Sequence, residues 1–452
     1  MMLDNNKVFV LGMARSGYEA AKILISKGYN VPVNDIKEDQ NSEQLKELES
    51  LGVQIVLGSH PSDLFDNTYS LVVKNPGIPN DHPYVLKALE NGIPVINEVE
   101  LAFRYFPSGV KIIGVTGTNG KTTTTTIIYE MLKAASKNVY LMGNIGYPVC
   151  SFISKLRTND IAVMEISDHQ LCNVLNFKTN ISVLTNLSEA HLDFHGSYEA
   201  YKEKKKRIFN HHTKSDIAIL NLDDQEVIDL TSDINSTKKF FSSKKANTIG
   251  SSIIDGFICY NGNKIIALDD IKIKGMHNYE NAMAAIAAVK ELKVEDDAII
   301  NTLKTFGGVE HRIEYVSKIN GREFYNDSKS TNVKSTQIAL ASFNSPTILL
   351  LGGLDRGHSF DGLKDYLKNV KLIVSYGETK MRIKDFAITN NIPCEIVDTL
   401  EEATKKAYSM SDKKDIILLS PSCASWDQFK DFEIRGNLFK DYVNQLGKED
   451  IE

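Results

Sequence analysis

Three short apolar runs in the chain are each followed by a glycine-containing turn and then by the apolar and polar spacing of a helix. These runs occupy 7–12, 110–116 and 347–353. A strand-like run followed by a turn and a helix is typical of parallel α/β architecture. The pattern therefore predicts an α/β protein in which each run opens a separate region.

Each run predicts further elements downstream. The first leads to a helix near 18–27 and to a second strand at 30–34. The second passes through a glycine loop into a helix that continues through Leu132. The third is followed by strands at 371–375 and 415–419. Strands that alternate with helices in this way indicate mostly parallel sheets.

The length of 452 residues exceeds the roughly 250–300 residues at which a single hydrophobic core stops growing. Glycine- and proline-containing turns at 106–109 and 306–308 separate the three regions. We therefore predict domains at 1–108, 109–309 and 310–452. The three regions show no internal repeat of fixed period.

Composition and charge exclude several classes of protein. A net charge of −6 argues against a nucleic-acid partner, because phosphate backbones are bound mainly by clustered lysine and arginine. The one basic run, at 202–207, is interpreted from composition alone as a solvated helix face. No apolar run approaches the ~18 residues of a membrane span, so we expect no membrane association.

The cysteines and the beginning of the chain favour a cytoplasmic protein. The five cysteines are far apart and form no C-x-x-C pair, so neither a disulfide framework nor a zinc site is indicated. Residues 1–7 lead directly into the first apolar run, with no basic and apolar segments of a secretion signal. We therefore expect a reducing, cytoplasmic environment.

The strongest chemical signal is the glycine-rich turn 114–123, Gly-Val-Thr-Gly-Thr-Asn-Gly-Lys-Thr-Thr. Such a turn directs backbone N–H groups and a helix N-terminus at phosphates, while Lys121 neutralises charge and Thr122 reaches Mg²⁺. Valine stands at 115, where the strict phosphate-loop pattern has its first glycine. The alternative is a plain strand-to-helix turn.

This turn resembles the Thr-Gly-Thr-x-Gly-Lys-Thr loop shared by the Mur ligases and the folylpolyglutamate synthases. The resemblance implies an ATP-dependent amide ligase that activates a carboxylate as an acyl phosphate. The residues that it places around ATP are Gly117, Thr118, Asn119, Gly120, Lys121, Thr122 and Thr123.

Glu165 lies near the carboxyl end of a predicted strand, where ligands bind in open α/β sheets. A carboxylate at that place suits Mg²⁺. The segment 165–171 resembles the Mur ligase segment Glu-[Leu/Ile]-Ser-Ser-Phe-Gln-Leu, which points to the same role. Asp168 and His169 stand where serine and phenylalanine are usual. They add an acid and a titratable ring close to the expected phosphates, and their role stays open.

Two further metal ligands follow from the resemblance. The segment 185–195 is similar to the family's Asn-x-x-x-x-His-x-Asp-x-His, which selects His191. The segment 201–209 is similar to one ending Lys-x-x-[Leu/Ile]-[Phe/Tyr], which selects Lys205. In most relatives this lysine is carbamylated by CO₂ and thereby becomes an anion that binds Mg²⁺. The implied set for two Mg²⁺ ions is Thr122, Glu165, His191 and Lys205.

Asparagines in two further segments match the family. By resemblance, Asn144 approaches the acceptor substrate, whereas Asn278 and Asn281 lie near the adenine. The alternative for all three is a structural role in turns and helix caps.

The turn 12–17 follows the first strand and retains two glycines of the dinucleotide fingerprint G-x-G-x-x-G. Asp35 ends the second strand, where an NAD-binding domain would hold a ribose. The same geometry serves any diphosphate, and the Mur ligases use it for the UDP of a UDP-sugar peptide. The segment 74–79 resembles another uridine-side loop of that family. The implied contacts are Arg15, Ser16, Asp35 and Asn75.

The segments 310–314 and 326–332 resemble ATP-side segments of the same ligases. The resemblance places Arg312 at phosphate, Asp327 near the ribose and Lys329 near the incoming amino acid.

The segments 420–429 and 432–436 resemble the branch of the family that adds D-glutamate. Ser425 and the backbone at Phe432 would hold the side-chain carboxylate of D-glutamate. Arg356 stands where some relatives have lysine, and a guanidinium binds a carboxylate through two parallel hydrogen bonds.

At least six ordered motifs thus imply a Mur ligase. Its fold would be a Rossmann-like N-terminal UDP-binding domain, a central P-loop ATPase-type domain with a mostly parallel sheet, and a Rossmann-like C-terminal domain. Its substrates would be ATP, UDP-N-acetylmuramoyl-L-alanine and D-glutamate, and we expect a monomer. The catalytic residues would be Lys121, Glu165, His191, Lys205, Arg312 and Lys329.

Two alternatives stay open. A folylpolyglutamate synthase shares the central loop but has no use for a UDP-binding region at 1–108. A non-catalytic nucleotide-binding regulatory protein would keep the loop without the reaction.

Overall fold

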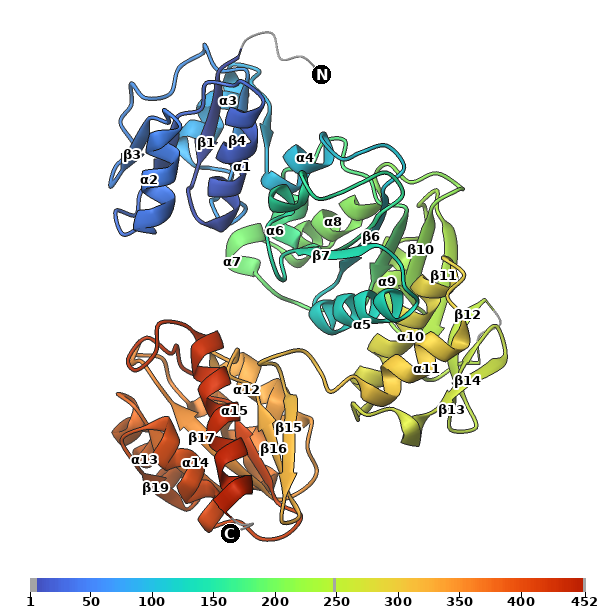
Figure 1. Ribbon diagram of the computed structural model, residues 1–452, viewed down its shortest axis with the longest axis vertical. Helices are drawn as coiled ribbons and strands as arrows, with labels where there is room; N and C mark the ends of the chain where they lie inside the picture. The colour runs from blue at the N-terminus through green and yellow to red at the C-terminus, as the bar shows by residue number, and fades with distance from the viewer. Residues whose placement is uncertain (1–5, 247–248, 450–452) are drawn as a thin grey trace. The chain divides into compact units, whose positions relative to one another are not determined.

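The computed structural model describes residues 6–246 and 249–449. The expectation that no secretion signal is present therefore falls partly outside the described residues. The chain packs as two units, Met1–Thr305 and Phe306–Glu452. The first unit contains two sheets and the second contains one (Figure 1). Each of the three predicted regions thus has its own sheet, and the borders at 108 and 309 stay predictions.

The N-terminal sheet has five parallel strands in the order β3-β2-β1-β4-β5. The strands are β1 Val8–Leu11, β2 Val33–Asp35, β3 Ile55–Leu57, β4 Leu71–Lys74 and β5 Val95–Ile96. The helices are α1 Arg15–Ser26, α2 Ser42–Ser50, α3 Pro83–Glu90 and α4 Glu98–Phe103. Alternate residues of β1 enter different cores: Val8 and Val10 pack with α1, whereas Phe9 and Leu11 pack with Phe65.

Two predicted elements of this region are displaced. The second strand begins at Val33 rather than at residue 30, in keeping with Pro32, which has no backbone N–H to donate to a sheet. Helix α1 begins at Arg15, three residues before the predicted start. The early start requires glycine at 17, because a Cβ there would lie 1.9 Å from the carbonyl oxygen of Gly12.

The central sheet has nine strands in the order β14-β13-β12-β11-β10-β9-β6-β8-β7. From β7 to β12 the neighbours are parallel, and β12, β13 and β14 form antiparallel pairs. The strands are β6 Lys111–Thr116, β7 Val139–Gly143, β8 Ile161–Glu165, β9 Ile181–Leu184, β10 Ile217–Asn221, β11 Thr237–Ser242, β12 Gly250–Ile254, β13 Phe257–Tyr260 and β14 Asn263–Ala267.

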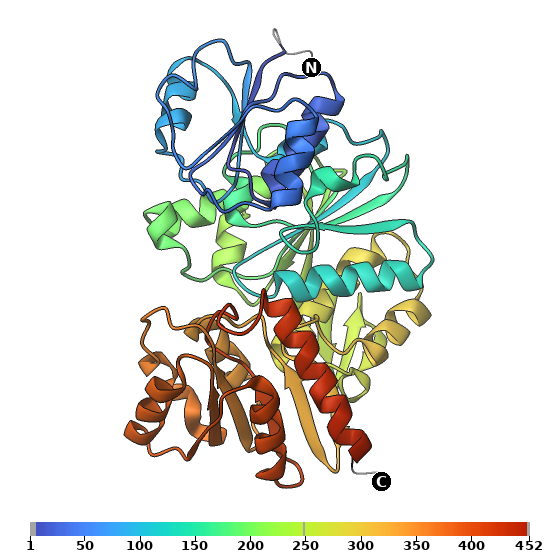
Figure 2. The same ribbon diagram turned by 60° about the vertical axis from the view of Figure 1, so that its left-hand side comes forward.

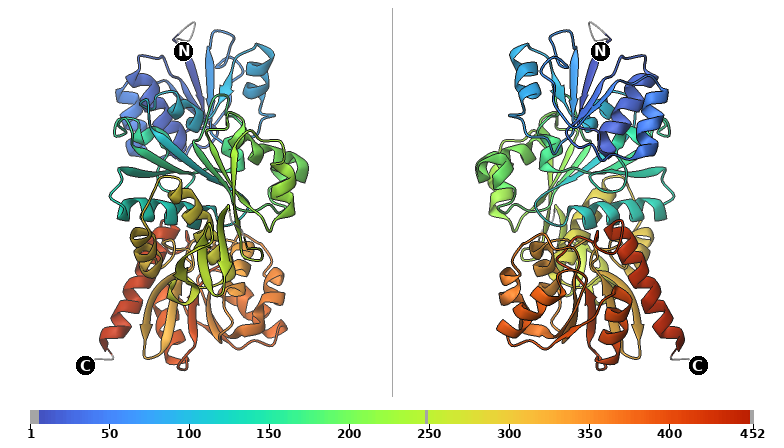
Figure 3. Two further views of the ribbon diagram at one scale, coloured as in Figure 1. Left: turned by 90° about the vertical axis from the view of Figure 1, so that its right-hand side faces the viewer. Right: turned by 90° about the vertical axis from the view of Figure 1, so that its left-hand side faces the viewer.

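Helices cover both faces of this sheet (Figure 3). They are α5 Lys121–Ala134, α6 Asp168–Leu171, α7 Leu192–His195, α8 Tyr198–Lys206, α9 Gln225–Leu230, α10 Met276–Lys290 and α11 Asp296–Thr305, with 3₁₀ turns η1 Val149–Phe152, η2 Arg207–Phe209 and η3 Leu268–Asp270. Strand β6 lies between β8 and β9, so the carboxyl ends of all three meet at one edge. Ligands of open α/β sheets bind at such an edge.

The C-terminal sheet has six strands in the order β15-β16-β20-β17-β18-β19, and only β15 and β16 are antiparallel. The strands are β15 Glu314–Ile319, β16 Arg322–Asn326, β17 Thr347–Gly352, β18 Val370–Tyr376, β19 Cys394–Ile396 and β20 Ile416–Leu419. The helices are α12 Val333–Ala341, η4 Asp361–Asn369, α13 Lys380–Thr389, α14 Leu400–Ser409 and α15 Phe432–Glu449.

Two cores sandwich this sheet. Helices α14 and α15 pack on one face with Ile348 and Leu350, and α12, η4 and α13 pack on the other with Leu349 and Leu351. Figure 2 shows the long red α15 beside the orange β15–β16 hairpin. The predicted α/β class with mostly parallel sheets is confirmed. Within the described part of the chain, no helix has the length and apolar character needed to cross a membrane.

Candidate functional site

The glycine loop between β6 and α5 has a shape that only glycine allows at two positions. Gly117 has φ 144°, and a Cβ there would lie 1.9 Å from Thr185 Oγ1. Gly120 has φ 78°, and a Cβ there would lie 2.2 Å from Asn281 Oδ1. Both contacts are far shorter than a carbon atom tolerates, so these glycines let the loop pass close to its neighbours. The N-terminus of α5 begins directly after Gly120.

The loop is fixed to the segment that follows β9. Thr118 donates its N–H to Asn186 O at 2.9 Å, and Asn119 donates its N–H to Asn186 Oδ1 at 2.9 Å. The hydroxyls of Thr118 and Tyr201 lie 2.9 Å apart. Backbone and side-chain bonds therefore hold the loop from two sides, and α5 starts in a defined direction.

Three predicted residues meet at the carboxyl edge of the sheet. Thr122 Oγ1 donates to Glu165 Oε2 at 2.6 Å, and Asn144 Nδ2 donates to Glu165 Oε1 at 2.7 Å. Glu165 is buried at the end of β8, Thr122 lies in the first turn of α5, and Asn144 follows β7. A hydroxyl and a carboxylate in contact are oxygen ligands of the kind that Mg²⁺ prefers.

The Lys121 side chain lies back over the loop from which it emerges. Its Nζ donates to Gly117 O at 2.9 Å and to Thr118 O at 2.8 Å. The ammonium therefore stands at the loop, where it can exchange carbonyl oxygens for phosphate oxygens.

Lys205 is completely buried, so the interpretation of the basic run as a solvated face is wrong at this position. Tyr201 and Lys205 are four residues apart and share the buried side of α8, whereas Lys204 and Lys206 are partly exposed. Lys205 Nζ donates to Gly117 O at 2.9 Å and to Asp168 Oδ1 at 3.3 Å. Burial, reinforced by the charge on Lys121, lowers the pKa of Lys205 to about 7.

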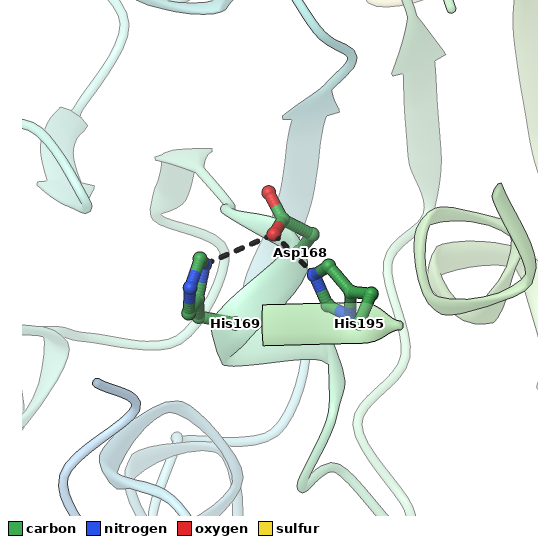
Figure 4. Close-up of side chains that lie close together, drawn as sticks. All are labelled: Asp168, His169 and His195. Carbon is green, nitrogen blue, oxygen red and sulfur yellow. Dashed lines mark hydrogen bonds and ion pairs between the residues drawn. The ribbon is translucent and has the colours of Figure 1, made fainter. Parts of the chain in front are cut away.

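Two histidines converge on a single oxygen of Asp168 (Figure 4). Asp168 Oδ2 lies 2.9 Å from His169 Nδ1 and 2.7 Å from His195 Nε2. Burial by itself would raise the pKa of Asp168, but the hydrogen bond from His169 and the charge on Lys205 hold it well below its usual range. Asp168 is thus a buried anion shared by two imidazoles and an amine.

His191 lies beside this group. It precedes α7 in a left-handed conformation, with φ 52°, and its ring centre is 5.0 Å from that of His169. It does not contact Glu165 or Lys205 directly through any hydrogen bond found in the described residues. Of the four predicted metal ligands, Thr122 and Glu165 are thus in direct contact, whereas His191 lies beside His169 and Lys205 beside Asp168.

A cavity of about 620 Å³ connects these residues with the N-terminal loops. The predicted residues among its lining are Arg15, Ser16, Asn75, Lys121, Asn144 and His191. Asp168 and His169 also line it. Residues predicted to bind the UDP substrate thus face the same space as the lysine predicted to bind ATP.

The N-terminal side of the cavity is built from the turns after β1 and β4. Asn75 Nδ2 donates to Ser16 Oγ at 3.1 Å and so joins the two turns. Asp35 lies outside the cavity lining. Its carboxylate instead accepts the N–H of Met13 at 2.7 Å and that of Lys37 at 2.9 Å, which fixes the turn after β1.

The two asparagines of α10 differ. Asn281 is buried, and its Oδ1 accepts the hydroxyl of Thr124 at 3.2 Å, close to the glycine loop. Asn278 is half-buried and donates to Lys274 O at 2.9 Å in the first turn of the helix. The structure thus brings Asn281 to the loop and gives Asn278 a contact at the helix start.

In the C-terminal unit, Asp327 is buried at the end of β16. Its carboxylate accepts the Ser420 hydroxyl at 2.6 Å and the Ile313 N–H at 3.2 Å. Burial raises the pKa of Asp327 to about 6, and the positive charge of nearby Arg312 acts in the opposite direction.

The remaining predicted residues of this unit lie around two aromatic rings. Lys329 Nζ lies 5.7 Å from the centre of the Phe432 ring, and the guanidinium of Arg356 lies 4.6 Å from that of Trp426. The Phe432 carbonyl accepts the Ser328 hydroxyl at 2.8 Å. Ser425 is buried, next to the exposed Trp426.

Comparison with known protein families covers most of the chain. Residues 6–97 match the Mur ligase MurD-like N-terminal domain, 115–289 the Mur ligase middle domain, and 311–423 the Mur ligase glutamate ligase domain. The chain belongs to the Mur ligase family. The family resemblance inferred from the sequence motifs is confirmed.

Curated Mur ligases resemble the chain over nearly its whole length. UDP-N-acetylmuramoylalanine--D-glutamate ligase of Geobacillus sp. (strain WCH70) is 46% identical over 98% of both chains. The enzyme of the same name from Geobacillus kaustophilus (strain HTA426) is 47% identical over 98% of both chains. The fold also resembles the crystal structure of UDP-N-acetylmuramate-alanine ligase MurC from Thermotoga maritima, with TM-score 0.60, 20% identity and coverage of 97% of this chain and 99% of that one.

Two features of this Mur ligase were not assigned from its sequence. The sequence motifs assign no role to His195 or to Glu98. Glu98 lines the cavity, and burial raises its pKa to about 7. The departure from the family pattern at Asp168 and His169 was the one sequence signal that could have led to His195.

Proposed function

We propose that this Mur ligase joins D-glutamate to UDP-N-acetylmuramoyl-L-alanine with ATP, as a step of peptidoglycan precursor synthesis. The observation that supports this proposal is the hydrogen bond between Thr122 and Glu165 beside the phosphate-type loop. It occurs in a chain that is 46% identical to a UDP-N-acetylmuramoylalanine--D-glutamate ligase. The glycine loop supplies the phosphate site, and the long alignment supplies the substrate assignment.

The reaction has two steps on the substrates. The carboxylate of the UDP substrate attacks the γ-phosphorus of ATP, which gives an acyl phosphate and ADP. The D-glutamate amine then attacks the acyl carbon, the amide bond forms, and inorganic phosphate leaves. The protein contributes mainly positioning and charge neutralisation. Lys121, the N-terminus of α5 and Arg312 would neutralise charge on the transferred phosphoryl group.

Magnesium fits the donors at the carboxyl edge. Thr122 and Glu165 would hold one Mg²⁺, and their oxygens are already in hydrogen-bond contact at 2.6 Å. His191 and Lys205 would hold a second. When bound, Mg²⁺ neutralises phosphate charge and orients phosphate oxygens.

Lys205 needs carbamylation to serve as a ligand, because an ammonium repels a cation. CO₂ reacts with the neutral amine, and burial, which lowers the pKa of Lys205 from 10.5 to about 7, makes that form available at neutral pH. Loss of CO₂ from the protein on acidification, followed by mass spectrometry, tests the modification.

The domains would divide the substrates. Residues 1–108 would bind the UDP substrate through Arg15, Ser16 and Asn75, with Asp35 fixing the turn after β1. Residues 109–309 would bind ATP through 117–123, with Asn278 and Asn281 near the adenine. Asn144 would approach the acceptor carboxylate.

Residues 310–452 would bind the amino acid. Arg312 would contact an ATP phosphate, and Asp327 would lie near the ribose. Lys329 would lie near the incoming amino acid. Ser425, Arg356 and the backbone at Phe432 would hold the D-glutamate side chain. We also propose that the protein is a cytoplasmic monomer.

Phosphate release across an amino-acid panel tests the function. With ATP, Mg²⁺ and UDP-N-acetylmuramoyl-L-alanine present, we expect release with D-glutamate and little with L-alanine, L-lysine or diaminopimelate. Release with another panel member would assign a different Mur ligase activity. ATP binding without release under any combination would favour the non-catalytic alternative.

A further inference from the structure

The side chains of Asp168, His169 and His195 form a group that the ligase reaction does not use. One donor atom from each, Asp168 Oδ2, His169 Nδ1 and His195 Nε2, lies within 4.8 Å of the other two. None of the three belongs to the residues proposed above for Mg²⁺. Figure 4 shows both imidazoles directed at the same carboxylate oxygen.

We propose that Asp168, His169 and His195 form a binding site for one divalent transition-metal ion, with Zn²⁺ as the simplest occupant. Two imidazole nitrogens and one carboxylate oxygen are a donor set found in zinc and other transition-metal sites. Mg²⁺ prefers a ligand set dominated by oxygen, so a site with two nitrogens among three protein donors favours a transition metal over Mg²⁺.

The distances suit an ion placed among the three donors. The carboxylate oxygen lies 2.9 Å from one nitrogen and 2.7 Å from the other. Around a tetrahedral Zn²⁺ with bonds of about 2.0–2.1 Å, neighbouring donors stand roughly 3.3 Å apart. An ion therefore requires each nitrogen to move away from the carboxylate oxygen by only a few tenths of an ångström, with loss of the protons now shared between them. The two nitrogens lie within 4.8 Å of each other and would have to stand at the same roughly 3.3 Å separation.

The local backbone holds the donors in place. Asp168 and His169 begin α6, whose start is fixed by a capping box between Ser167 and Gln170. His195 ends α7, and only 2% of its side chain is exposed. Donors on short, fixed elements lose little entropy when they bind an ion.

The site is open on one side. Asp168 and His169 line the 620 Å³ cavity, so the remaining coordination positions face space that water or a ligand can enter. The second oxygen of Asp168 lies 3.3 Å from Lys205 Nζ. One carboxylate would thus link the ion to the lysine that we propose as a magnesium ligand.

Metal binding by the whole chain tests this site without any assay of ligation. EDTA-treated protein is titrated with Co²⁺, and binding is followed by its visible absorption and by equilibrium dialysis. We expect one tightly bound ion per chain, with the intense absorption of low-coordinate, nitrogen-ligated Co²⁺. Zn²⁺ should displace it, and a large excess of Mg²⁺ should not.

The D168S/H169F double variant removes two donors and places the residues usual in the family at both positions. Circular dichroism checks its fold, because Lys205 loses its partner Asp168. Its Co²⁺ affinity should fall by more than about 100-fold, because loss of outer-shell partners alone costs about 10–100-fold. His211→Gln is the matched control, since His211 is exposed and remote from the three donors in the sequence. It should keep wild-type binding.

A second measurement needs no variant. In ¹⁵N-histidine spectra of the wild-type chain, Zn²⁺ should shift the signals of His169 and His195 and leave His211 unchanged. The proposal is overturned if those two signals stay fixed, if Mg²⁺ displaces Co²⁺, or if D168S/H169F binds Co²⁺ like the wild type.

Discussion

The glycine loop at 117–123 and the buried group around Asp168 lie side by side and are built in opposite ways. The loop is made by the backbone: two glycines allow a close approach, and N–H groups bind the segment after β9. The Asp168 group is made by titratable side chains from three separate segments. The loop therefore depends on local conformation, and the Asp168 group on charges that compensate one another.

This difference predicts that side-chain changes in the loop affect mainly function, whereas changes in the Asp168 group affect mainly stability. Removing a side chain that projects from the loop changes what the loop can bind but leaves its backbone intact. Removing one member of the Asp168 group leaves the others buried with an unbalanced charge, which is costly in a low-dielectric interior. The predictions below test that separation, beginning with the largest effect.

Replacing Lys121 with alanine should lower the ligation rate by at least about 100–1,000-fold, the usual cost of losing one group that stabilises developing charge. Binding of the UDP substrate, measured by calorimetry, should stay near the wild-type value. Lys133→Ala, an exposed change in the same helix, is the control. Equal losses of rate and of UDP-substrate affinity would contradict the assigned role.

In protein freed of CO₂ and held below the Lys205 pKa of about 7, where the amine is protonated, replacing Lys205 with methionine should destabilise the first unit by about 3–5 kcal/mol, because it breaks a buried ion pair with Asp168. The measurement is denaturant unfolding of the protein, monitored through hydrogen exchange of amides in the first unit. Lys206→Met removes the exposed pair with Asp233 and should have no measurable effect. A similar, small loss of unfolding free energy in both variants would show that the ion pair between Lys205 and Asp168 does not stabilise the fold.

His212 offers a comparison in which a titratable ring is buried among hydroxyls. Its ring contacts Thr179, Ser182 and Ser236, and burial lowers the pKa of His212 from 6.5 to about 4. The neutral ring therefore contributes stability above pH 6.5 that is lost as the pH falls through about 4. That contribution is about 3 kcal/mol at most, because a tenfold change in a protonation equilibrium is about 1.4 kcal/mol.

The His212→Gln variant should lose this dependence between pH 6.5 and 4 while remaining folded at neutral pH. Unfolding free energies measured at several pH values check it. An unchanged slope in the variant would assign the acid sensitivity to other groups.

The smallest loss of stability is expected for a change at the exposed Asn144. Asn144→Ala removes one donor to Glu165, but Asn144 is exposed and water can replace it, so the loss of stability should be about 1 kcal/mol or less. A loss as large as that of Lys205→Met would mean that Asn144 is part of the folded core.

Much of the loop was predictable because its information is local. A strand, three spaced glycines and Gly-Lys-Thr specify a turn whose conformation depends on residues within ten positions of one another. The same holds for the strands that were predicted, β1, β2, β6, β8, β17, β18 and β20, which appear as short apolar runs. The antiparallel strands β12–β14 and the β15–β16 hairpin were not predicted. The predicted start of the second strand was three residues too early, because the apolar pattern does not show that Pro32 lacks the N–H that a sheet needs.

The Asp168 group was not predictable in the same way. His195 lies 27 residues from Asp168 and Lys205 lies 37 residues away, and no spacing rule relates such distances. Composition alone placed Lys205 on a solvated face, and only the family resemblance selected it. Burial of one lysine in the basic run 202–207 follows from the packing of α8, which is a property of the folded chain.

A crystal structure with Mg²⁺ and a non-hydrolysable ATP analogue tests the central claim most directly. We expect the terminal phosphates within 117–123, Lys121 Nζ moved from Gly117 O to a phosphate oxygen, and a metal ion between Thr122 and Glu165. A loop without nucleotide, with Lys121 still on Gly117 and Thr118 and with Thr122 still hydrogen-bonded to Glu165, would contradict the account.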